Sequence, residues 1–205
     1  MAEMFEYDDD RELKSAARVR ALESLLIEKG LITGDTVDQV LKYFETEMGP
    51  FNGAKVVAKA WVDPAFKELL LEDPTAAIAT MDFPSGMAGA EGEHMIAVEN
   101  KPGIHNLIVC TLCSCYPWPV LGLPPYWYKD PTFRARAARE PRAVLGEFGL
   151  EFDEDTEIRV WDSSAQIRWF VLPEQPAGTE GMSEAELAAL ITPEAMMGVA
   201  RVEAP

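Results

Sequence analysis

Hydrophobic residues near the start of the chain recur with the spacing of a helix. Val19, Leu22 and Leu26 stand at positions i, i+3 and i+7, and Gly30 follows where a helix commonly ends. This pattern predicts a helix over residues 9–29. Two further helical segments, bounded by Gly, Pro or Asp residues, are predicted over 36–48 and 53–71, the second with a break near Asp63-Pro64.

The first two helices carry apolar stripes but have no predicted strand beside them. A short amphipathic helix is marginal in water, so such a segment needs a surface to cover. We therefore interpret residues 1–50 as an N-terminal helical arm that contacts a partner or the rest of the chain. Residues 51–205 then form the main domain.

The pattern changes to that of strands after a loop rich in glycine. Short segments with β-branched or aromatic residues and turn residues at both ends are predicted as strands at 94–99, 104–109, 157–161 and 167–172. Helices are predicted at 134–148 and at 183–191, where Ser183 and Glu186 have the spacing of a capping box. The expected fold class is α+β: a helical arm, then a layered α/β domain whose short-stranded sheet is mixed or antiparallel.

Charge excludes several classes of function. Asp and Glu total 35 against 18 Lys and Arg, a net charge of −17. Such a chain repels nucleic acids and anionic membranes. The acidic start MAEMFEYDDD lacks the features of a secretory signal, and the 3 cysteines lie too close together for a disulfide framework. A soluble, cytoplasmic protein is expected.

One segment departs from this composition, because no Asp, Glu, Lys or Arg occurs between Pro102 and Tyr128. Four prolines within it exclude a transmembrane helix. The pattern predicts a buried strand, IHNLIV, that leads into a proline-stiffened loop. A reactive site needs support of this kind.

All three cysteines fall in that loop, within Cys110-Thr111-Leu112-Cys113-Ser114-Cys115, which we call the metal loop (residues 110–115). Three buried cysteines acting as small hydrophobes is one interpretation. A zinc site needs a fourth ligand, from His94 or His105, and an iron–sulfur cluster needs a fourth thiolate. Each histidine stands on a predicted strand, and we expect both to be buried residues with satisfied hydrogen bonds.

The spacing of the metal loop also allows its backbone to complete a coordination sphere. The sulfurs of Cys113 and Cys115 and the amide nitrogens of Ser114 and Cys115 make a planar set closed by chelate rings. Cys110 adds a sulfur from below, which leaves one position open for catalysis. Thiolates and deprotonated amides favour a trivalent low-spin ion such as cobalt or iron.

The segment VCTLCSCYPWP at 109–119 resembles the metal-binding loop of the nitrile hydratase alpha subunit. Similarity continues through VLGLPPYWYKDP, GAKVVAKAWVDP, GEHMIAVEN, IRVWDSSAQIR and VLPEQPAGTEG, almost everywhere after Arg18. The resemblance implies a non-haem iron or non-corrin cobalt centre that hydrates a nitrile to an amide. Cys110 would be the axial thiolate, Cys113 a sulfinate and Cys115 a sulfenate. Cys113, Ser114 and Cys115 would form the catalytic set.

The resemblance also implies the metal and a substrate pocket. Thr111 and Tyr116 match the cobalt type rather than the iron type, so one Co(III) per chain is expected, with Fe(III) the lesser alternative. Tyr116 and Trp118 would wall the pocket. Glu91 stands where many relatives have Gln, and this departure puts that position's hydrogen bonds in doubt.

A partner follows from the charge of the centre. Thiolate, sulfinate, sulfenate and two amidates outweigh a trivalent ion, and an uncompensated buried charge is unfavourable. The resemblance implies that a separate beta subunit supplies two arginines, in an αβ heterodimer or α2β2 assembly, and that an activator protein delivers cobalt. The cations that follow the uncharged segment are instead interpreted as a solvated helix face: Lys129, Arg134, Arg136, Arg139 and Arg142.

Two alternatives remain at the level of sequence. A thiocyanate hydrolase subunit shares the metal loop, but that family tends to carry Arg where this chain has Trp118. A non-enzymatic redox or metal-storage module would use the same thiols without turning over a nitrile.

Overall fold

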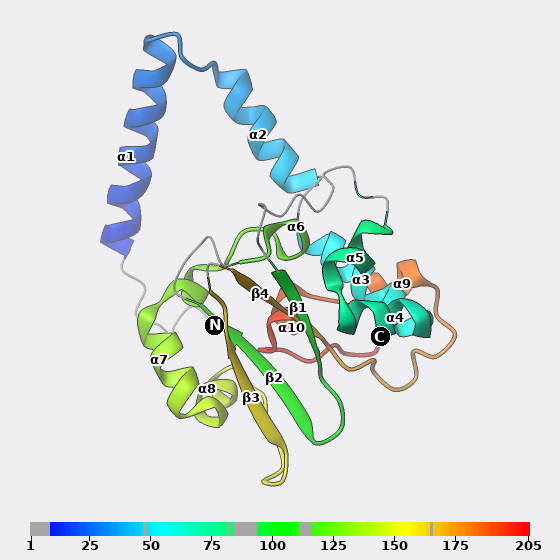
Figure 1. Ribbon diagram of the computed structural model, residues 1–205. Coiled ribbons are helices and arrows are strands. Elements are labelled where there is room, and N and C mark those ends of the chain that lie inside the picture. The colour runs from blue at the N-terminus through cyan, green and yellow to red at the C-terminus, as the bar shows by residue number, and fades with distance from the viewer. Residues whose placement is uncertain (1–8, 47–48, 82, 84–93, 111–115, 165) are drawn as a thin grey trace. The chain divides into compact units, whose positions relative to one another are not determined.

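The computed structural model describes residues 9–46, 49–81, 83, 94–110, 116–164 and 166–205. The chain divides into two compact units, Met1–Glu47 and Met48–Pro205 (Figure 1). Among the described residues, no helix combines the length and the apolar character needed to cross a lipid bilayer.

The N-terminal unit consists of two helices, α1 (Asp9–Glu28) and α2 (Gly34–Thr46). The predicted helices are thus confirmed, within a few residues at their ends. Thr33 caps α2, because its Oγ1 accepts a hydrogen bond of 3.2 Å from the Thr36 amide. Large apolar side chains of the unit are exposed to solvent, including Leu13, Val19, Leu22, Leu31, Val40 and Leu41.

The second unit contains short helices, most of which begin with proline. They are α3 (Pro50–Val62), α4 (Pro64–Glu72), α5 (Pro74–Ala79), α6 (Trp118–Leu121), the 3-10 helix η2 (Tyr126–Lys129), α7 (Pro131–Arg139), α8 (Pro141–Glu147), α9 (Glu184–Ala188) and α10 (Pro193–Met197). Proline suits the first turn because its missing N–H has no partner there.

Local caps decide where these helices break. The carboxylate of Asp63 accepts a hydrogen bond from the Phe66 amide, so the predicted break at Asp63-Pro64 separates α3 from α4. The single helix predicted at 134–148 was wrong, since Pro141 ends it and two helices form, α7 and α8. The predicted capping box between Ser183 and Glu186 is confirmed at the start of α9.

Each of the four predicted strands is present among the described residues: β1 (His94–Glu99), β2 (Ile104–Val109), β3 (Glu157–Asp162) and β4 (Ile167–Leu172). Their pairing differs from the expected mixed or antiparallel sheet. β1 pairs with β4 and β2 pairs with β3, and both pairs are parallel (Figure 1). Helices cover the strands, with α4 and α5 on β1, α10 on β4 and α8 on β3.

The turn between β1 and β2 closes with a single antiparallel bridge between Lys101 and Ile104, and side-chain hydrogen bonds take the place of a longer hairpin ladder. Asn100 Oδ1 accepts a hydrogen bond of 2.7 Å from the backbone amide of Asn106. The Asn106 side chain in turn donates to the Glu99 carbonyl over 2.8 Å. These bonds use groups that a hairpin ladder would need, so β2 pairs instead with β3 after a long helical crossover.

The two predicted histidine environments have different outcomes. His105 is buried, its Nε2 lies 2.7 Å from the Gly198 carbonyl and its Nδ1 lies 3.3 Å from Asn100 Nδ2, as expected for a satisfied core histidine. His94 was expected to be buried as well, but it is exposed at the start of β1. At His105 the Gly198 carbonyl can only accept a hydrogen bond, and the side-chain amide nitrogen of Asn100 can only donate one. His105 is therefore the neutral tautomer that carries its proton on Nε2.

Protonation of His105 should therefore oppose folding. Burial lowers the pKa of His105 below its ordinary value of 6.5, and Arg201 lowers it further. Its contribution to the free energy of unfolding is complete above pH 6.5 and falls as the pH drops toward the folded-state pKa. His105→Gln keeps a donor and an acceptor but cannot titrate, so its thermal midpoint should fall less steeply below pH 6.5. His94→Gln is the exposed control, and parallel profiles for wild type and H105Q would contradict this role.

Gly198 should be intolerant of any side chain. Its φ is 86°, and an added Cβ would lie 1.9 Å from the Asn106 carbonyl oxygen of β2. Gly178 has the same φ of 86° but no heavy atom within 4 Å of an added Cβ. Gly178→Ala should lose about 1 kcal/mol from backbone conformation alone. Gly198→Ala should lose about 3 kcal/mol or more in denaturant unfolding, and equal losses would show that the close approach is unimportant.

Candidate metal centre

Cys110 is the described member of the metal loop, and it follows directly after β2. Its side chain is buried, with 2% of the residue exposed. The remaining loop residues, among them Cys113, Ser114 and Cys115, lie outside the described residues, as does Glu91. Their roles as ligands, catalytic groups or pocket residues stay predictions.

Pairing with β3 holds Cys110 at a fixed place. Five of the six residues of β2 are buried, and Val109 is in register with Asp162. The Ser163 amide extends the ladder by donating to the Val109 carbonyl over 2.9 Å. The thiol is therefore delivered at the carboxyl end of a parallel strand pair, a common position for functional groups.

Tyr116 secures the chain on the other side of the metal loop. Its ring is 2% exposed and meets Tyr128 edge to face, with ring centroids 5.1 Å apart. The hydroxyl donates to the Leu121 carbonyl over 3.4 Å and lies 3.5 Å from Met197 Sδ. Burial raises the pKa of this hydroxyl, so it stays neutral. In this chain Tyr116 is a core residue, and its predicted part in a substrate pocket has no support from these contacts.

Trp118 begins α6 and is half-buried. The backbone around it is fixed on α3, because Asn52 Nδ2 donates to the Pro119 carbonyl over 3.1 Å. At Gly53 an added Cβ would lie 2.3 Å from the Val120 carbonyl oxygen, so α3 and α6 are in very close contact. The backbone that carries Trp118 is therefore fixed, and the pocket role of its side chain stays a prediction.

A buried arginine near Cys110 was missed at the level of sequence. Arg168, in β4, is only 5% exposed, and its Nη1 donates to the Ser164 carbonyl over 2.7 Å. The loop that leads into β4 starts at Ser163, whose amide is bonded to Val109, so Arg168 belongs to the same end of the strands as Cys110. The signal was present: in IRWFVL the alternation of a strand places Arg168 on the inward face with Phe170.

A second cation lies within electrostatic reach of Cys110. Arg134, on α7, forms an ion pair with Asp162, and this hydrogen bond raises the pKa of Arg134. The charge of Cys110 raises the same pKa further, as a smaller effect. Arg134 and Asp162 also line a cavity of about 410 Å³ whose walls include Val109, Ala135 and Val160.

The other cations of this region serve local structure. Arg136 pairs with Glu140 and Glu147, and Arg142 donates to several backbone carbonyls between Phe152 and Thr156. These side chains are exposed or half-buried on α7 and α8, which agrees with their interpretation as a solvated face. Arg134 differs from these arginines because it forms the ion pair with Asp162 at the end of β3.

These surroundings fit an anionic metal centre. A buried thiolate is unfavourable without a positive partner, and the guanidinium groups of Arg168 and Arg134 occupy the same end of the strands. Within the described ranges, no group of three or more His, Cys, Asp or Glu side chains has a geometry that would hold a metal. The candidate metal site remains the one predicted from the sequence, which is the metal loop that begins at Cys110.

Comparison with known proteins identifies the family. The family model described as nitrile hydratase, alpha chain, matches residues 13–200. The low-molecular weight cobalt-containing nitrile hydratase subunit alpha of Rhodococcus rhodochrous is 56% identical over 90% of this chain and 87% of its own length.

Two further similarities are informative. A double mutant of the Fe-type nitrile hydratase from Comamonas testosteroni Ni1 superposes with a TM-score of 0.81 and 44% identity, covering 97% of this chain and 94% of that chain. Thiocyanate hydrolase subunit gamma of Thiobacillus thioparus is 39% identical over 88% of this chain and 76% of its own length. From the family match and these identities, we conclude that the chain belongs to the nitrile hydratase alpha-chain family.

Proposed function

We propose that this chain is the alpha subunit of a nitrile hydratase that converts a nitrile to the amide at a low-spin, non-corrin Co(III) centre. The observation that carries the proposal is the buried Cys110 at the end of β2, the first residue of the C-T-L-C-S-C motif, in a chain of this family. Cys110 would be the axial thiolate. Cys113, Ser114 and Cys115 would complete the set through two sulfurs and two amide nitrogens.

Cobalt is the metal that the available comparisons favour. The relative named as cobalt-containing is 56% identical, whereas the Fe-type structure is 44% identical. Thr111 and Tyr116 are the residue types of the cobalt pattern, although Tyr116 acts here through packing against Tyr128. Selectivity between two trivalent low-spin ions must come from such outer contacts, because the immediate ligands are the same.

The chemistry divides between the metal and the protein. The metal, when bound, would supply Lewis-acid chemistry toward the nitrile. Cys115, as a sulfenate, would activate the water that adds to the nitrile carbon. Alternatively its oxygen would bond to that carbon, and a water would then break the S–O bond to the product and re-form the sulfenate. Either route adds one water, and the resulting imidic acid would tautomerise to the amide. Half-buried Trp118 would contact the apolar part of the substrate, and Glu91 is a further pocket candidate.

Arg168 would balance part of the negative charge from within the chain. Its guanidinium is 5% exposed and fixed by the Ser164 carbonyl, so it cannot turn away to solvent. A charge held in this way stabilises oxidised, anionic sulfurs more strongly than a solvated lysine would. Arginines from a beta subunit would supply the rest, and an activator protein would deliver cobalt.

A thiocyanate hydrolase subunit is the second candidate. It is favoured by the 39% identity to the Thiobacillus thioparus subunit, but this value is well below 56%. Trp118 stands where that family tends to carry Arg, which supports the nitrile assignment. Comparing turnover of a nitrile and of thiocyanate by the purified enzyme separates the two candidates, and also separates both from a redox or storage module.

The metal and its ligands can be tested by composition. We expect about one cobalt per chain, two added oxygens on Cys113, one on Cys115 and none on Cys110. Elemental analysis and peptide mass spectrometry measure these quantities. Cys113→Ala and Cys115→Ala should each abolish cobalt retention and turnover. Zinc in active protein, or three unmodified thiols, would sink this proposal.

The role of Arg168 can be tested by cobalt content rather than activity alone. Arg168→Met removes the buried charge and should weaken cobalt retention about 10-fold to 100-fold. Arg168→Lys should restore part of it. Arg159→Met is the matched control, since Arg159 lies on neighbouring β3 in an exposed pair with Glu157. If R168M kept full cobalt and fully oxidised cysteines, Arg168 would be a structural residue only.

The partner can be tested through the helical arm. Leu22 is 60% exposed and Leu31 is 68% exposed, and a subunit contact is a reason to keep such side chains in water-facing positions. The chain alone should be inactive and poorly soluble, and should co-purify with a beta subunit. Deleting residues 1–46, or Leu22→Glu, should reduce assembly measured by light scattering, whereas Glu28→Gln should not. An intact, active heteromer without the arm would disprove this contact.

A further inference from the structure

A second cavity lies at the far end of β2 from the metal loop. Its volume is about 360 Å³, and it is lined by the start of β2, the loop before β3, the segment after β4 and the C-terminal residues 200–202. With about 3.3 Å per strand residue, Ile104 and Cys110 are roughly 20 Å apart. The cavity is therefore separate from the proposed metal centre.

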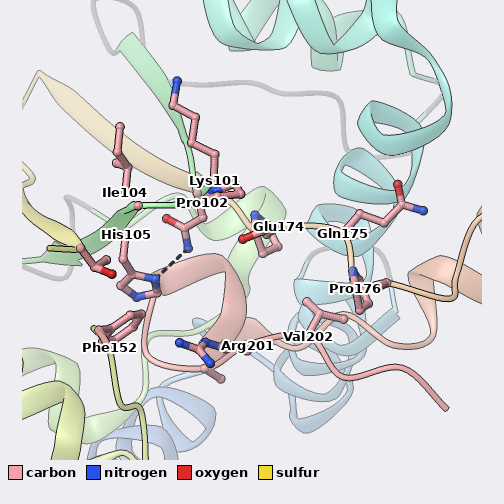
Figure 2. Close-up of a pocket in the computed structure, with 16 residues that line it drawn as sticks. Lys101, Pro102, Ile104, His105, Phe152, Glu174, Gln175, Pro176, Arg201 and Val202 are labelled. Carbon is pink, nitrogen blue, oxygen red and sulfur yellow. Dashed lines mark hydrogen bonds between the residues drawn. The ribbon is translucent and has the colours of Figure 1, made fainter. Parts of the chain in front are cut away.

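The walls of this cavity combine apolar side chains with polar and charged ones. Figure 2 shows Phe152 beside His105, and Pro176 and Val202 farther along the same cavity. The polar groups at its base are used within the protein, since His105 bonds to Gly198 and Asn100. A cavity of this size that combines apolar walls with polar side chains suits a small organic molecule that carries a polar group.

Arg201 is the charged group best placed to select that molecule. Its guanidinium carbon lies 4.9 Å from the centre of the Phe152 ring, and its Nη2 donates to the Glu151 carbonyl over 2.8 Å. These contacts hold the planar group and use one of its five N–H donors, so donors remain for a ligand. Among the described residues, Arg201 takes part in no ion pair.

The surrounding charges restrict the ligand. Figure 2 shows Lys101 extending away from Arg201, so the guanidinium is the principal cation of the cavity. Glu174 also lines the cavity, and the adjoining loop carries Glu151 and Asp153. These carboxylates repel any anion in proportion to its charge, so a monoanion is disfavoured less than a dianion. One planar carboxylate also matches the fork of the Arg201 guanidinium.

We propose that this cavity binds a small organic monocarboxylate, with its carboxylate on Arg201 and its hydrocarbon part against Phe152, Pro176 and Val202. The site depends only on residues of this chain and does not require the metal or the proposed reaction. A carboxylate is also the product class of amide hydrolysis, so the ligand would come from the reaction type that consumes an amide.

The test uses the purified assembled protein and sodium benzoate, with benzamide as the neutral molecule of the same shape. Calorimetric titration of the wild type should show benzoate binding that benzamide does not reproduce. Arg201→Gln should weaken that binding at least about tenfold, because a charge-assisted hydrogen-bonded pair is lost. Arg201→Lys should be intermediate, and Glu174→Gln should strengthen binding by removing repulsion.

Each outcome has a definite meaning. Benzoate that acts instead at the metal centre would inhibit turnover equally in wild type and R201Q, and that result would overturn the proposal. Equal affinity in both proteins, or equal dependence of benzamide binding on Arg201, would overturn it as well. The thermal midpoint of R201Q, compared with that of the wild type, serves as the folding control.

Discussion

The hydrogen bond from the Asn106 amide to the Asn100 side chain takes the place of a ladder bond between β1 and β2. It occupies a backbone donor that a β1–β2 hairpin would have used, and Asn106 itself binds the Glu99 carbonyl. β2 is therefore available to β3, and β1 to β4, in two parallel pairs. Both the position of Cys110 at a strand end and the proximity of Arg168 follow from that arrangement, because the loop from β3 to β4 is bonded to Val109.

Charge is the second constraint on the site. The metal loop lies in a segment without Asp, Glu, Lys or Arg, yet the chemistry proposed for it concentrates negative charge. The fold places two arginines at the same end of the strands, the buried Arg168 of β4 and the more exposed Arg134 of α7. Because Arg168 is almost fully desolvated, its interaction with a nearby anion is screened far less than that of a surface pair.

Local signals were the part of the structure that the sequence predicted well. Asp63-Pro64 separates two helices and Ser183 with Glu186 begins another, since both depend on residues a few positions apart. Pairing direction was not predictable in the same way, because it depends on a side-chain bond from Asn100 that no periodicity reveals. Arg168 stands in a strand rich in apolar residues, where only the alternation of buried and less buried positions marks it as facing inward.

The parallel pairing also determines how late in biosynthesis the strands can pair. Neither strand pair can form until its later strand has been synthesised. Cys110 is synthesised a long stretch of chain before Leu172, where β4 ends. At typical synthesis rates this interval lasts about 3–12 s. During it the cysteines belong to a nascent chain without its sheet partners, exposed to cellular reductants and to adventitious metals. The metal capture and cysteine oxidation proposed for this loop would therefore be late events, which follow synthesis of β4.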